Sequence, residues 1–420
     1  MSNSSPNGSA TMDNKLYNSS ATVQLAAHVV AKSDLRDCIV RILRSHPLSR
    51  QLRITDLGSA GGVNSIRLLR YIESILHENG EYRPVEYIFE DLPTSDFNEL
   101  VKTIHESQLS NQFYPMCIGK SFYKKLFPPN SVHLSLSYIT LHWLSYAPGK
   151  NFKCYCKLII EKIYIEDLGS SGKLTIISIL DIELGGGETS CGMTFVQPNE
   201  ANVNYDIFEN FRAISLNDLT LFLKLRADEL CDNGEGLFMM LGRGDLGCDE
   251  SENKKRTSFI RGPNGSVYKE AFENAAKDPN YSEIATEIER VHRATFIPYF
   301  LRSESDVMES FEHVTDLLEL RQLEWKDCNI NCGSPEGLID LIWSIHGHAL
   351  QKGIRKEVQH DEPMISQLSP SISGTENVFN KIVEALKLHM GLIAKRDFPD
   401  GQTTATYMYM VVKRKPRQQM

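Results

Sequence analysis

The pattern of apolar and polar residues in the first quarter of the chain predicts alternating strands and helices. Apolar side chains recur at helical spacing over residues 23–43, which indicates one or two helices. Apolar runs at residues 52–57 and 86–91 predict two strands, and residues 66–76 between them carry a helical stripe. A strand, a glycine-rich turn, a helix and a second strand in this order predict a βαβ unit.

The alternation continues along the rest of the chain. Further strands are expected at residues 131–137, 174–180, 237–241 and 406–412. Residues 207–230 are typical of a helix, and the apolar residues from Phe379 to Ile393 follow the spacing of an amphipathic helix. Residues 242–257 are rich in Gly and charged side chains and are expected to form a mobile loop. The whole pattern predicts a mostly parallel α/β sheet with inserted helices that can form a lid.

Composition and charge narrow the class of protein. The hydrophobic fraction of 41% and charged fraction of 24% are ordinary for a globular protein, and the formal net charge of −9 argues against a nucleic-acid surface. No apolar run approaches the roughly 20 residues that cross a bilayer, and the N-terminus lacks the apolar core of a signal peptide. Nine scattered cysteines, an odd number, favour free thiols in a reducing compartment. We therefore expect a cytoplasmic protein with no nucleic-acid and no membrane partner.

Three short motifs are expected to have no ligand-binding role. Cys154 and Cys156 have one residue between them and no second Cys/His pair nearby, unlike the usual zinc ligands. His346 and His348 lie in a helical-looking segment without adjoining acids, which favours packing or surface roles over metal ligation. The basic residues 413–417 are typical of a solvated tail rather than a targeting signal. We expect no metal site.

The segment from Asp56 to Asn64 is the first candidate for ligand binding. Gly58, Gly61 and Gly62 lack a Cβ, so they can adopt positive φ and let the backbone approach a ligand closely. The spacing is not that of a phosphate-binding P-loop and the lysine of that motif is absent, which disfavours a nucleoside triphosphate. A dinucleotide site and a merely structural turn are the alternatives that this segment leaves open.

Asp91 is the second candidate, because it ends the second predicted strand. Doubly wound folds place there, about 20 to 30 residues after the loop, an acid that accepts hydrogen bonds from ribose hydroxyls. The alternative is a capping or turn-forming role ahead of Leu92 and Pro93. A ligand with a ribose, no phosphate and a sulfonium cation suits a net-acidic site better than NAD does.

Five motifs share their order with one family of enzymes. Tyr17 and Gln24 resemble that family's Tyr-Ala-x-Asn-Ser-x-x-Gln segment, and residues 56–64 resemble its Asp-Leu-Gly-Cys-Ser-Ser-Gly-Pro-Asn loop. Residues 90–98 resemble Asn-Asp-Leu-Pro-Gly-Asn-Asp-Phe-Asn, residues 121–128 resemble Ser-Phe-Tyr-x-Arg-Leu-Phe-Pro, and residues 141–145 match Leu-His-Trp-Leu-Ser. Over most of its length the chain thus resembles the SABATH family, the salicylate, benzoate and theobromine methyltransferases.

The resemblance implies a fold and a division of the chain. The implied fold is α/β, a Rossmann-like class I methyltransferase sheet with an inserted α-helical cap. We expect a flexible leader at residues 1–14, an S-adenosylmethionine-binding core with the start of the cap at 15–245, and a mainly helical cap at 246–400. One core strand is expected near 311–322 within the cap region, and residues 401–420 are expected to hold the final core strand and a basic tail. The resemblance also implies a homodimer.

The resemblance further implies roles for single residues. Cofactor-binding residues would be Tyr17, Asp56, Gly58 and Asn64 toward the methionine portion, Asp91 and Leu92 toward the ribose and adenine, and Ser121 and Phe122 toward the adenine. Gln24, His142 and Trp143 match positions that hold the acceptor's carboxylate, and their amide, imidazole and indole N–H groups are all donors. For His142 and Trp143 the alternative is ordinary core packing.

The implied reaction converts a small apolar or aromatic carboxylic acid to its methyl ester and S-adenosylmethionine to S-adenosylhomocysteine. An acid with a pKa near ~4.3 is ionised at neutral pH, so its oxygen can attack the methyl group without a general base or a metal. Departures from the family pattern, Ser59-Ala60-Gly61 in the loop and Ile139 in place of a common Tyr, bear on affinity and acceptor choice. N-methylation of a heterocycle, and a catalytically silent ligand-binding relative, are the alternatives.

Overall fold

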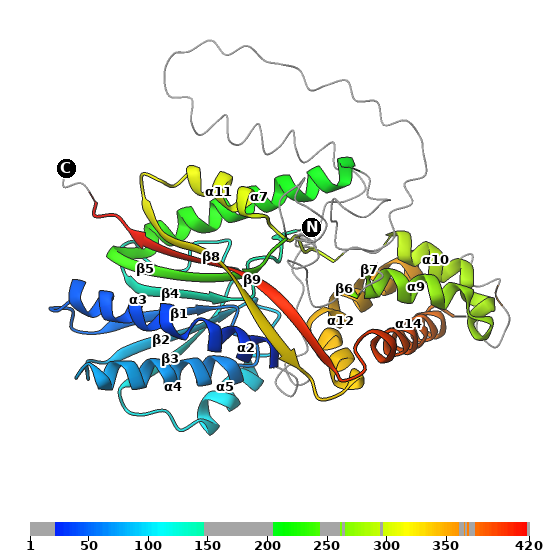
Figure 1. Cartoon of the computed structure of the whole chain (residues 1–420), viewed down its shortest axis with the longest axis horizontal. Helices are drawn as coiled ribbons and strands as arrows, with labels where there is room; N and C mark the ends of the chain where they lie inside the picture. Colours follow the sequence, from blue (N-terminus) through cyan, green and yellow to red (C-terminus); the bar gives the residue numbers. More distant parts are fainter. Residues whose placement is uncertain are drawn as a thin grey trace, which may run out of the picture.

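The computed structural model describes residues 22–146, 205–243, 261–262, 265–294, 297–360, 365, 368 and 374–417. Over this part of the chain the fold is a seven-stranded sheet with helices on both faces and a second group of helices beside it (Figure 1). A short antiparallel pair, β6 (Arg261–Gly262) and β7 (Gly265–Ser266), leads into that second group.

The sheet has the strand order β3-β2-β1-β4-β5-β9-β8. Its strands are β1 (Leu52–Leu57), β2 (Val85–Asp91), β3 (Phe113–Gly119), β4 (Val132–Tyr138), β5 (Leu230–Leu241), β8 (Leu318–Asn331) and β9 (Gln402–Arg414). Strands β1 to β5 run parallel, whereas β9 is antiparallel to both β5 and β8. This confirms the mostly parallel α/β sheet, and it brings the carboxyl ends of β1, β2 and β4 to one edge, where such folds bind ligands.

Helices cover the sheet in two layers and also form the cap. One face carries α2 (Thr22–Val30), α3 (Lys32–Ser45), α4 (Val63–Glu78) and α5 (Phe97–Glu106), and the other carries α7 (Tyr205–Glu229) and α11 (Glu304–Glu312) (Figure 1). The cap consists of α9 (Val267–Lys277), the 3₁₀ turn η1 (Pro279–Ile284), α10 (Ala285–Ala294), α12 (Pro335–His360) and α14 (Thr375–Asp397). The chain leaves the cap after α10, forms α11 and β8 in the sheet layer, and returns to the cap with α12 and α14.

Two apolar cores lie on the two faces of the sheet. One contains Ile54 of β1 and Leu136 of β4 and continues into the cap through Ile342 of α12 and Leu386 of α14. The other packs Phe238 of β5 against α7 and α11. Because the cap shares the first core with the sheet, apolar burial holds the two together.

Most of the predicted elements are confirmed. Residues 23–43 form the two helices α2 and α3, residues 66–76 lie within α4, and residues 207–230 correspond to α7. The predicted strands at 52–57, 86–91 and 131–137 are β1, β2 and β4, while those at 237–241 and 406–412 lie within the longer β5 and β9. The helix from Phe379 to Ile393 lies within α14. Residues 1–14, 174–180 and nearly all of 242–257 lie outside the described residues.

Two strands differ from the expectation. The strand expected near residues 311–322 begins only at Leu318, because Phe311 and Glu312 end α11 and residues 313–317 form the turn that follows it. Ser303 and Asp306 form a capping box that starts this helix, each side chain accepting from the other's backbone N–H, at 3.3 and 2.9 Å. Strand β3 was not expected at all, because it is an edge strand whose apolar Tyr114 and Met116 are exposed, which hides the usual alternation.

Candidate active site

The glycine loop lies between β1 and α4 and takes the backbone conformation that its glycines allow. Gly58 and Gly62 both have φ of +85°. A Cβ on Gly58 would lie 2.3 Å from Cγ2 of Thr140, so only glycine fits there. Thr140 also donates from its hydroxyl to the carbonyl oxygen of Leu57 at 3.3 Å, and so joins the end of β1 to the segment that follows β4.

Asp91 holds the same loop from the neighbouring strand. Its Oδ2 accepts from the backbone N–H of Ala60 at 2.7 Å, and its Oδ1 accepts from the N–H of Leu92 at 2.7 Å and the hydroxyl of Ser95 at 2.6 Å. The turn-forming role weighed for Asp91 is therefore present. A carboxylate has about four lone-pair positions, and three are used, so room is left for one further donor such as a ribose hydroxyl.

Asp56 ends β1 in a buried position and is an unusually weak acid. Burial is the main cause that raises its pKa to about 6, hydrogen bonds from Ser65 and the Tyr87 hydroxyl act in the opposite direction, and the charge of Asp91 adds to the rise. The Tyr87 hydroxyl donates to Oδ2 of Asp56 at 3.2 Å. A carboxylate that is costly to ionise in the free protein is one that gains from a cationic ligand. Asn64, in the first turn of α4, is also buried.

Glu90 is a buried acid that the sequence analysis did not single out. Its side chain is fully buried, its Oε2 accepts from the N–H of Gly58 at 3.2 Å, and its backbone carbonyl accepts from the N–H groups of Gly58 and Ser59, both at 2.9 Å. Burial raises the pKa of Glu90 well above its usual range, and the charge of Arg226 lowers it. Strand alternation in the sequence could have indicated Glu90, because it puts Glu90 and Asp91 on opposite faces of β2.

Ser121 and Phe122 lie in the segment between β3 and β4, beside the same edge of the sheet. Oγ of Ser121 accepts from the N–H of Tyr123 at 3.2 Å. The half-buried Phe122 ring meets the Phe222 ring of α7 edge-on, with centroids 5.8 Å apart. The hydroxyl of Tyr123 donates to the carbonyl oxygen of Trp143 at 2.7 Å, which ties this segment to the other candidate residues.

His142 and Trp143 follow β4 and are lined by residues 297–303. The N–H of Phe300 donates to the carbonyl oxygen of His142 at 2.9 Å, and the Tyr299 ring lies 4.7 Å from the His142 ring. His142 is only 2% exposed, and its Nδ1 has no hydrogen-bond partner among the described residues. Burial, followed by the nearby His346 and Arg302, lowers the pKa of His142 well below its usual range. His142 is thus a neutral imidazole, which can donate one hydrogen bond.

Trp143 is half-buried where the cap meets the sheet. Its ring lies 5.5 Å from the His346 ring of α12 and 5.9 Å from the Tyr299 ring. His346 itself is buried and hydrogen-bonded to the Tyr268 hydroxyl at 2.9 Å, in keeping with a packing role.

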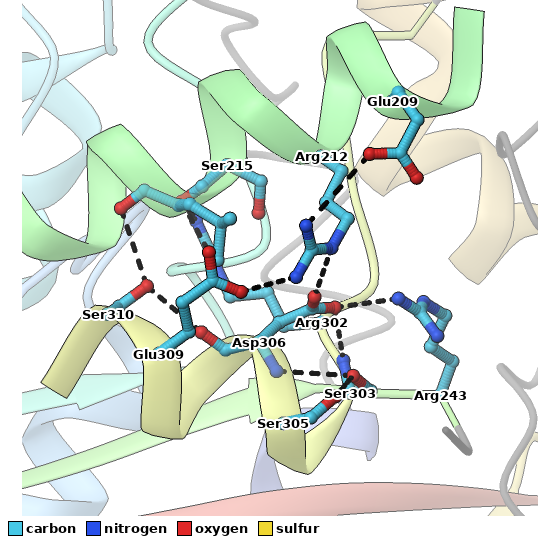
Figure 2. A network of polar contacts seen from close by, with 11 residues as sticks. Glu209, Arg212, Ser215, Arg243, Arg302, Ser303, Ser305, Asp306, Glu309 and Ser310 are labelled. Atoms are coloured by element: carbon cyan, nitrogen blue, oxygen red, sulfur yellow. Dashed lines mark hydrogen bonds and ion pairs between the residues drawn. The ribbon is translucent and has the colours of Figure 1, made fainter. Parts of the chain in front are cut away.

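A buried polar network holds residues 297–303 in place (Figure 2). Asp306 pairs with Arg212 of α7 and with Arg243 beyond β5, each at 2.7 Å. Arg302 is fully buried and donates to the carbonyl oxygen of Ser215, at 2.8 Å from Nη2, and to that of Leu141, the residue before His142. Through these contacts the network attaches the backbone next to His142 to α7 and α11.

The sequence-predicted residues between Asp56 and Trp143 therefore lie at one edge of the sheet. The two predicted residues nearer the N-terminus are considered separately. Tyr17 lies outside the described residues, and Gln24 lies in the first turn of α2. Cys154 and Cys156 also lie outside. Within the described ranges, no group of three or more His, Cys, Asp or Glu side chains is arranged to hold a metal ion. In the same ranges, no helix combines the length and apolar character needed to span a bilayer.

Comparison with solved structures identifies the fold. The structure of a loganic acid methyltransferase with S-adenosylhomocysteine superimposes with a TM-score of 0.63 at 16% sequence identity, covering 99% of this chain and 100% of that one. Together with the strand order and the glycine loop after β1, this similarity shows that the chain has the class I methyltransferase fold.

Sequence comparison shows which proteins the chain resembles. Residues 8–182 match the family described as SAM dependent carboxyl methyltransferase. The jasmonate O-methyltransferase of Arabidopsis thaliana is 23% identical over 88% of both chains. The 3,7-dimethylxanthine N-methyltransferase of Camellia sinensis var. assamica is 30% identical over 35% of this chain and 42% of its own. The chain is thus similar to the S-adenosylmethionine-dependent carboxyl methyltransferases, the SABATH family, and this similarity indicates S-adenosylmethionine as the methyl donor.

Proposed function

We propose that this enzyme methylates the carboxylate of a small apolar or aromatic acid to give the methyl ester. The observation that carries the proposal is the position of His142 and Trp143, directly after β4 and tied through Tyr123 to the segment beside the donor site. A neutral imidazole and an indole are hydrogen-bond donors, which an acceptor carboxylate requires. The family match and the acid named for the jasmonate methyltransferase support an acid acceptor.

The residues of the glycine loop fit the methyl donor. The buried carboxyl of Asp56 suits a ligand that carries a positive charge, and the positive φ of Gly58 and Gly62 shapes the loop that the ligand approaches. We assign Tyr17, Asp56, Gly58 and Asn64 to its methionine portion. The remaining cofactor assignments are Asp91 and Leu92 to the ribose and adenine, and Ser121 and Phe122 to the adenine.

The chemistry needs positioning rather than proton transfer. S-adenosylmethionine, when bound, supplies an electrophilic methyl group on a sulfonium. Gln24, His142 and Trp143 would hold an acceptor oxygen in line with the S–CH₃ bond, and the cap would keep water out. One C–S bond breaks as one C–O bond forms. The acid is already ionised at neutral pH, so no general base is needed.

The location and the assembly of the enzyme are also part of the proposal. We assign it to the cytoplasm because nine scattered cysteines suit a reducing compartment, and the thiols of Cys38 and Cys328 are free and buried. We assign it a homodimeric state on the family resemblance. Light scattering of the purified protein tests the second assignment.

The central experiment compares acceptor kinetics with donor binding. His142→Ala and Gln24→Ala are expected to raise KM or lower kcat for transfer of a radiolabelled methyl group to a panel of small carboxylic acids. Binding of S-adenosylhomocysteine, measured by calorimetry, should stay nearly unchanged. Unchanged kinetics in both variants would contradict the acceptor assignment.

The same panel separates the alternatives. It should include purine heterocycles, because the chain is also similar to a dimethylxanthine N-methyltransferase. Turnover of a purine and of no acid would favour N-methylation. Binding of S-adenosylhomocysteine without turnover of any compound would favour a catalytically silent relative.

A further inference from the structure

The segment Ser121–Phe127 is an irregular stretch between β3 and β4 that forms neither helix nor strand. Its backbone N–H and C=O groups cannot use the sheet ladder, so they need partners from elsewhere in the fold. Since we place the adenine of the methyl donor against Ser121 and Phe122, the shape of this segment bears directly on donor binding.

The last turn of α7 supplies those partners. Arg226 donates from Nη1 to the carbonyl oxygen of Phe122 at 3.1 Å and from Nη2 to that of Lys124 at 3.3 Å. Glu229 accepts through Oε1 from the N–H groups of Leu126 at 2.6 Å and Phe127 at 3.2 Å. One helix therefore binds four backbone groups of the segment, two carbonyls with a cation and two amides with an anion.

Arg226 and Glu229 form a buried ion pair. Nη2 of Arg226 lies 2.9 Å from Oε2 of Glu229, and both side chains are almost fully buried. Removing two charges from water costs energy that their attraction repays only in part, so such a pair is weak evidence for stability. Stability alone therefore does not explain a buried ion pair at this place. Its four hydrogen bonds to the backbone of the segment Ser121–Phe127 offer an explanation.

The pair also orients the Phe122 ring. The guanidinium of Arg226 lies 5.2 Å from the centroid of the Phe222 ring, and Phe222 in turn meets Phe122 edge-on at 5.8 Å. Phe222 is fully buried, so it cannot move to follow a displaced Phe122. The Phe122 ring, which we assign to the adenine, is thus held by its contact with Phe222, and the Phe122 backbone is held by the hydrogen bond from Arg226.

Glu90 connects the ion pair to the other side of the donor site. Nε of Arg226 and Oε1 of Glu90 both lack a hydrogen-bond partner within the described residues, and the charge of Arg226 acts to lower the pKa of Glu90 against the effect of burial. Glu90 accepts from Gly58 of the glycine loop at 3.2 Å. Polar side chains of α7 and β2 therefore contact both segments expected to enclose the donor.

We propose that Arg226 and Glu229 are positioning residues for the methyl donor, which preorganise the segment Ser121–Phe127 to receive the adenine. They touch neither the adenine nor the acceptor and act through the backbone at Phe122, Lys124, Leu126 and Phe127. This inference rests on the proposed placement of the adenine. A rigid segment binds more tightly because less ordering is left to the binding step.

A purely structural role is the competing explanation, since the pair also joins α7 to the sheet layer. The two explanations differ in what they affect. A structural role predicts a lower melting temperature with unchanged donor affinity in the folded protein. A positioning role predicts weaker binding of every ligand that carries the adenosyl group, whether or not it carries the amino acid portion.

The test uses Arg226→Lys and Glu229→Gln in the full chain. Lysine keeps the charge but cannot reach two carbonyls with a planar fork, and glutamine keeps the shape but loses the charge. Each variant is expected to bind S-adenosylhomocysteine and 5′-methylthioadenosine about tenfold more weakly in calorimetry, by the same factor for both ligands. KM for the acceptor at saturating donor should change less than the donor affinity does, because the segment reaches the acceptor side only through the bond from Tyr123 to Trp143.

Arg212→Lys is the matched control. Arg212 is on the same helix, fourteen positions or about 21 Å before Arg226, and it pairs with Asp306 instead of the segment. It should lower the melting temperature by a similar amount without changing the affinity for either ligand.

Phe122→Ala separates failure of this inference from failure of the proposed site. If Phe122→Ala weakens S-adenosylhomocysteine binding and both α7 variants bind like the unmodified protein, the positioning role is wrong and the adenine placement stands. If Phe122→Ala also binds normally, the adenine placement fails as well. Should Arg226→Lys not fold, the affinity of Glu229→Gln alone decides between the two explanations.

Discussion

The hydroxyl of Tyr123 donates a hydrogen bond of 2.7 Å to the carbonyl oxygen of Trp143. It is a direct link between the segment beside the donor and the residue assigned to the acceptor. Through this link, the geometry of one half of the site depends on the other.

Loss of that link should be felt mainly by the acceptor. Tyr123→Phe keeps the ring and removes the donor, which costs about 1 kcal/mol and frees the backbone at Trp143. We expect the KM of the acceptor to rise about fivefold at saturating S-adenosylmethionine, measured by initial rates. An acceptor KM that does not move would show that the bond has no part in positioning Trp143.

The buried carboxyl of Asp56 should make donor binding depend on pH. Its pKa of about 6 in the free protein means that it is largely neutral at pH 5 and ionised at pH 7.5. Only the ionised form attracts the ammonium group of the amino-acid portion, so the affinity for S-adenosylhomocysteine should rise with pH through this window. Calorimetry at a series of pH values measures the change, and Asp56→Asn should flatten the profile.

The same pKa has a consequence for stability with the opposite sign. The pKa rises from 3.8 in the unfolded chain to about 6 in the folded one, so ionising Asp56 costs the folded state about 3 kcal/mol as pH increases from 3.8 through 6. Ligand-free Asp56→Asn should therefore melt at a higher temperature than the unmodified protein at pH 7.5. A lower melting temperature for the variant at pH 7.5 would contradict this account.

Gly58 should not tolerate a side chain. Alanine there combines a left-handed backbone with a Cβ only 2.3 Å from Thr140, and we expect a loss of about 2–5 kcal/mol of unfolding free energy together with donor binding. Gly80 is the matched control, because its φ is +67° and no atom lies within 4 Å of its Cβ position. Gly80→Ala should cost about 1–2 kcal/mol in urea unfolding and leave binding intact.

Asp306 should be the most sensitive member of the network in Figure 2. Asp306→Asn removes the buried carboxylate that Arg243 and Arg212 share, and we expect a loss of about 3–5 kcal/mol in unfolding free energy. Glu309, whose side chain is 49% exposed, pairs with the same Arg212, and Glu309→Gln should cost less than about 1 kcal/mol. Similar losses in both variants would mean that burial does not set the strength of these pairs.

Local patterns in the sequence were enough to find the glycine loop, most of the strands and helices, and the order of the motifs. Such features depend on neighbours a few positions apart, through hydrophobic periodicity and the freedom of glycine backbones. They were insufficient for β3, where an exposed edge strand carries no alternation, and for the start of β8, because α11 and the turn after it occupy the residues up to 317.

The amino-acid sequence was sufficient for the family resemblance, the methyl donor that it implies and the edge of the sheet at which Asp56 and Asp91 lie. Tertiary contacts alone revealed that Glu90 is buried, that Arg226 and Glu229 bind the backbone of the segment Ser121–Phe127, and that Arg302 supports the backbone before His142. Arg302 and Leu141 are 161 positions apart in the chain. Burial and charge at such distances arise only when the chain is folded, because they are properties of the surroundings of a residue and not of its neighbours in sequence.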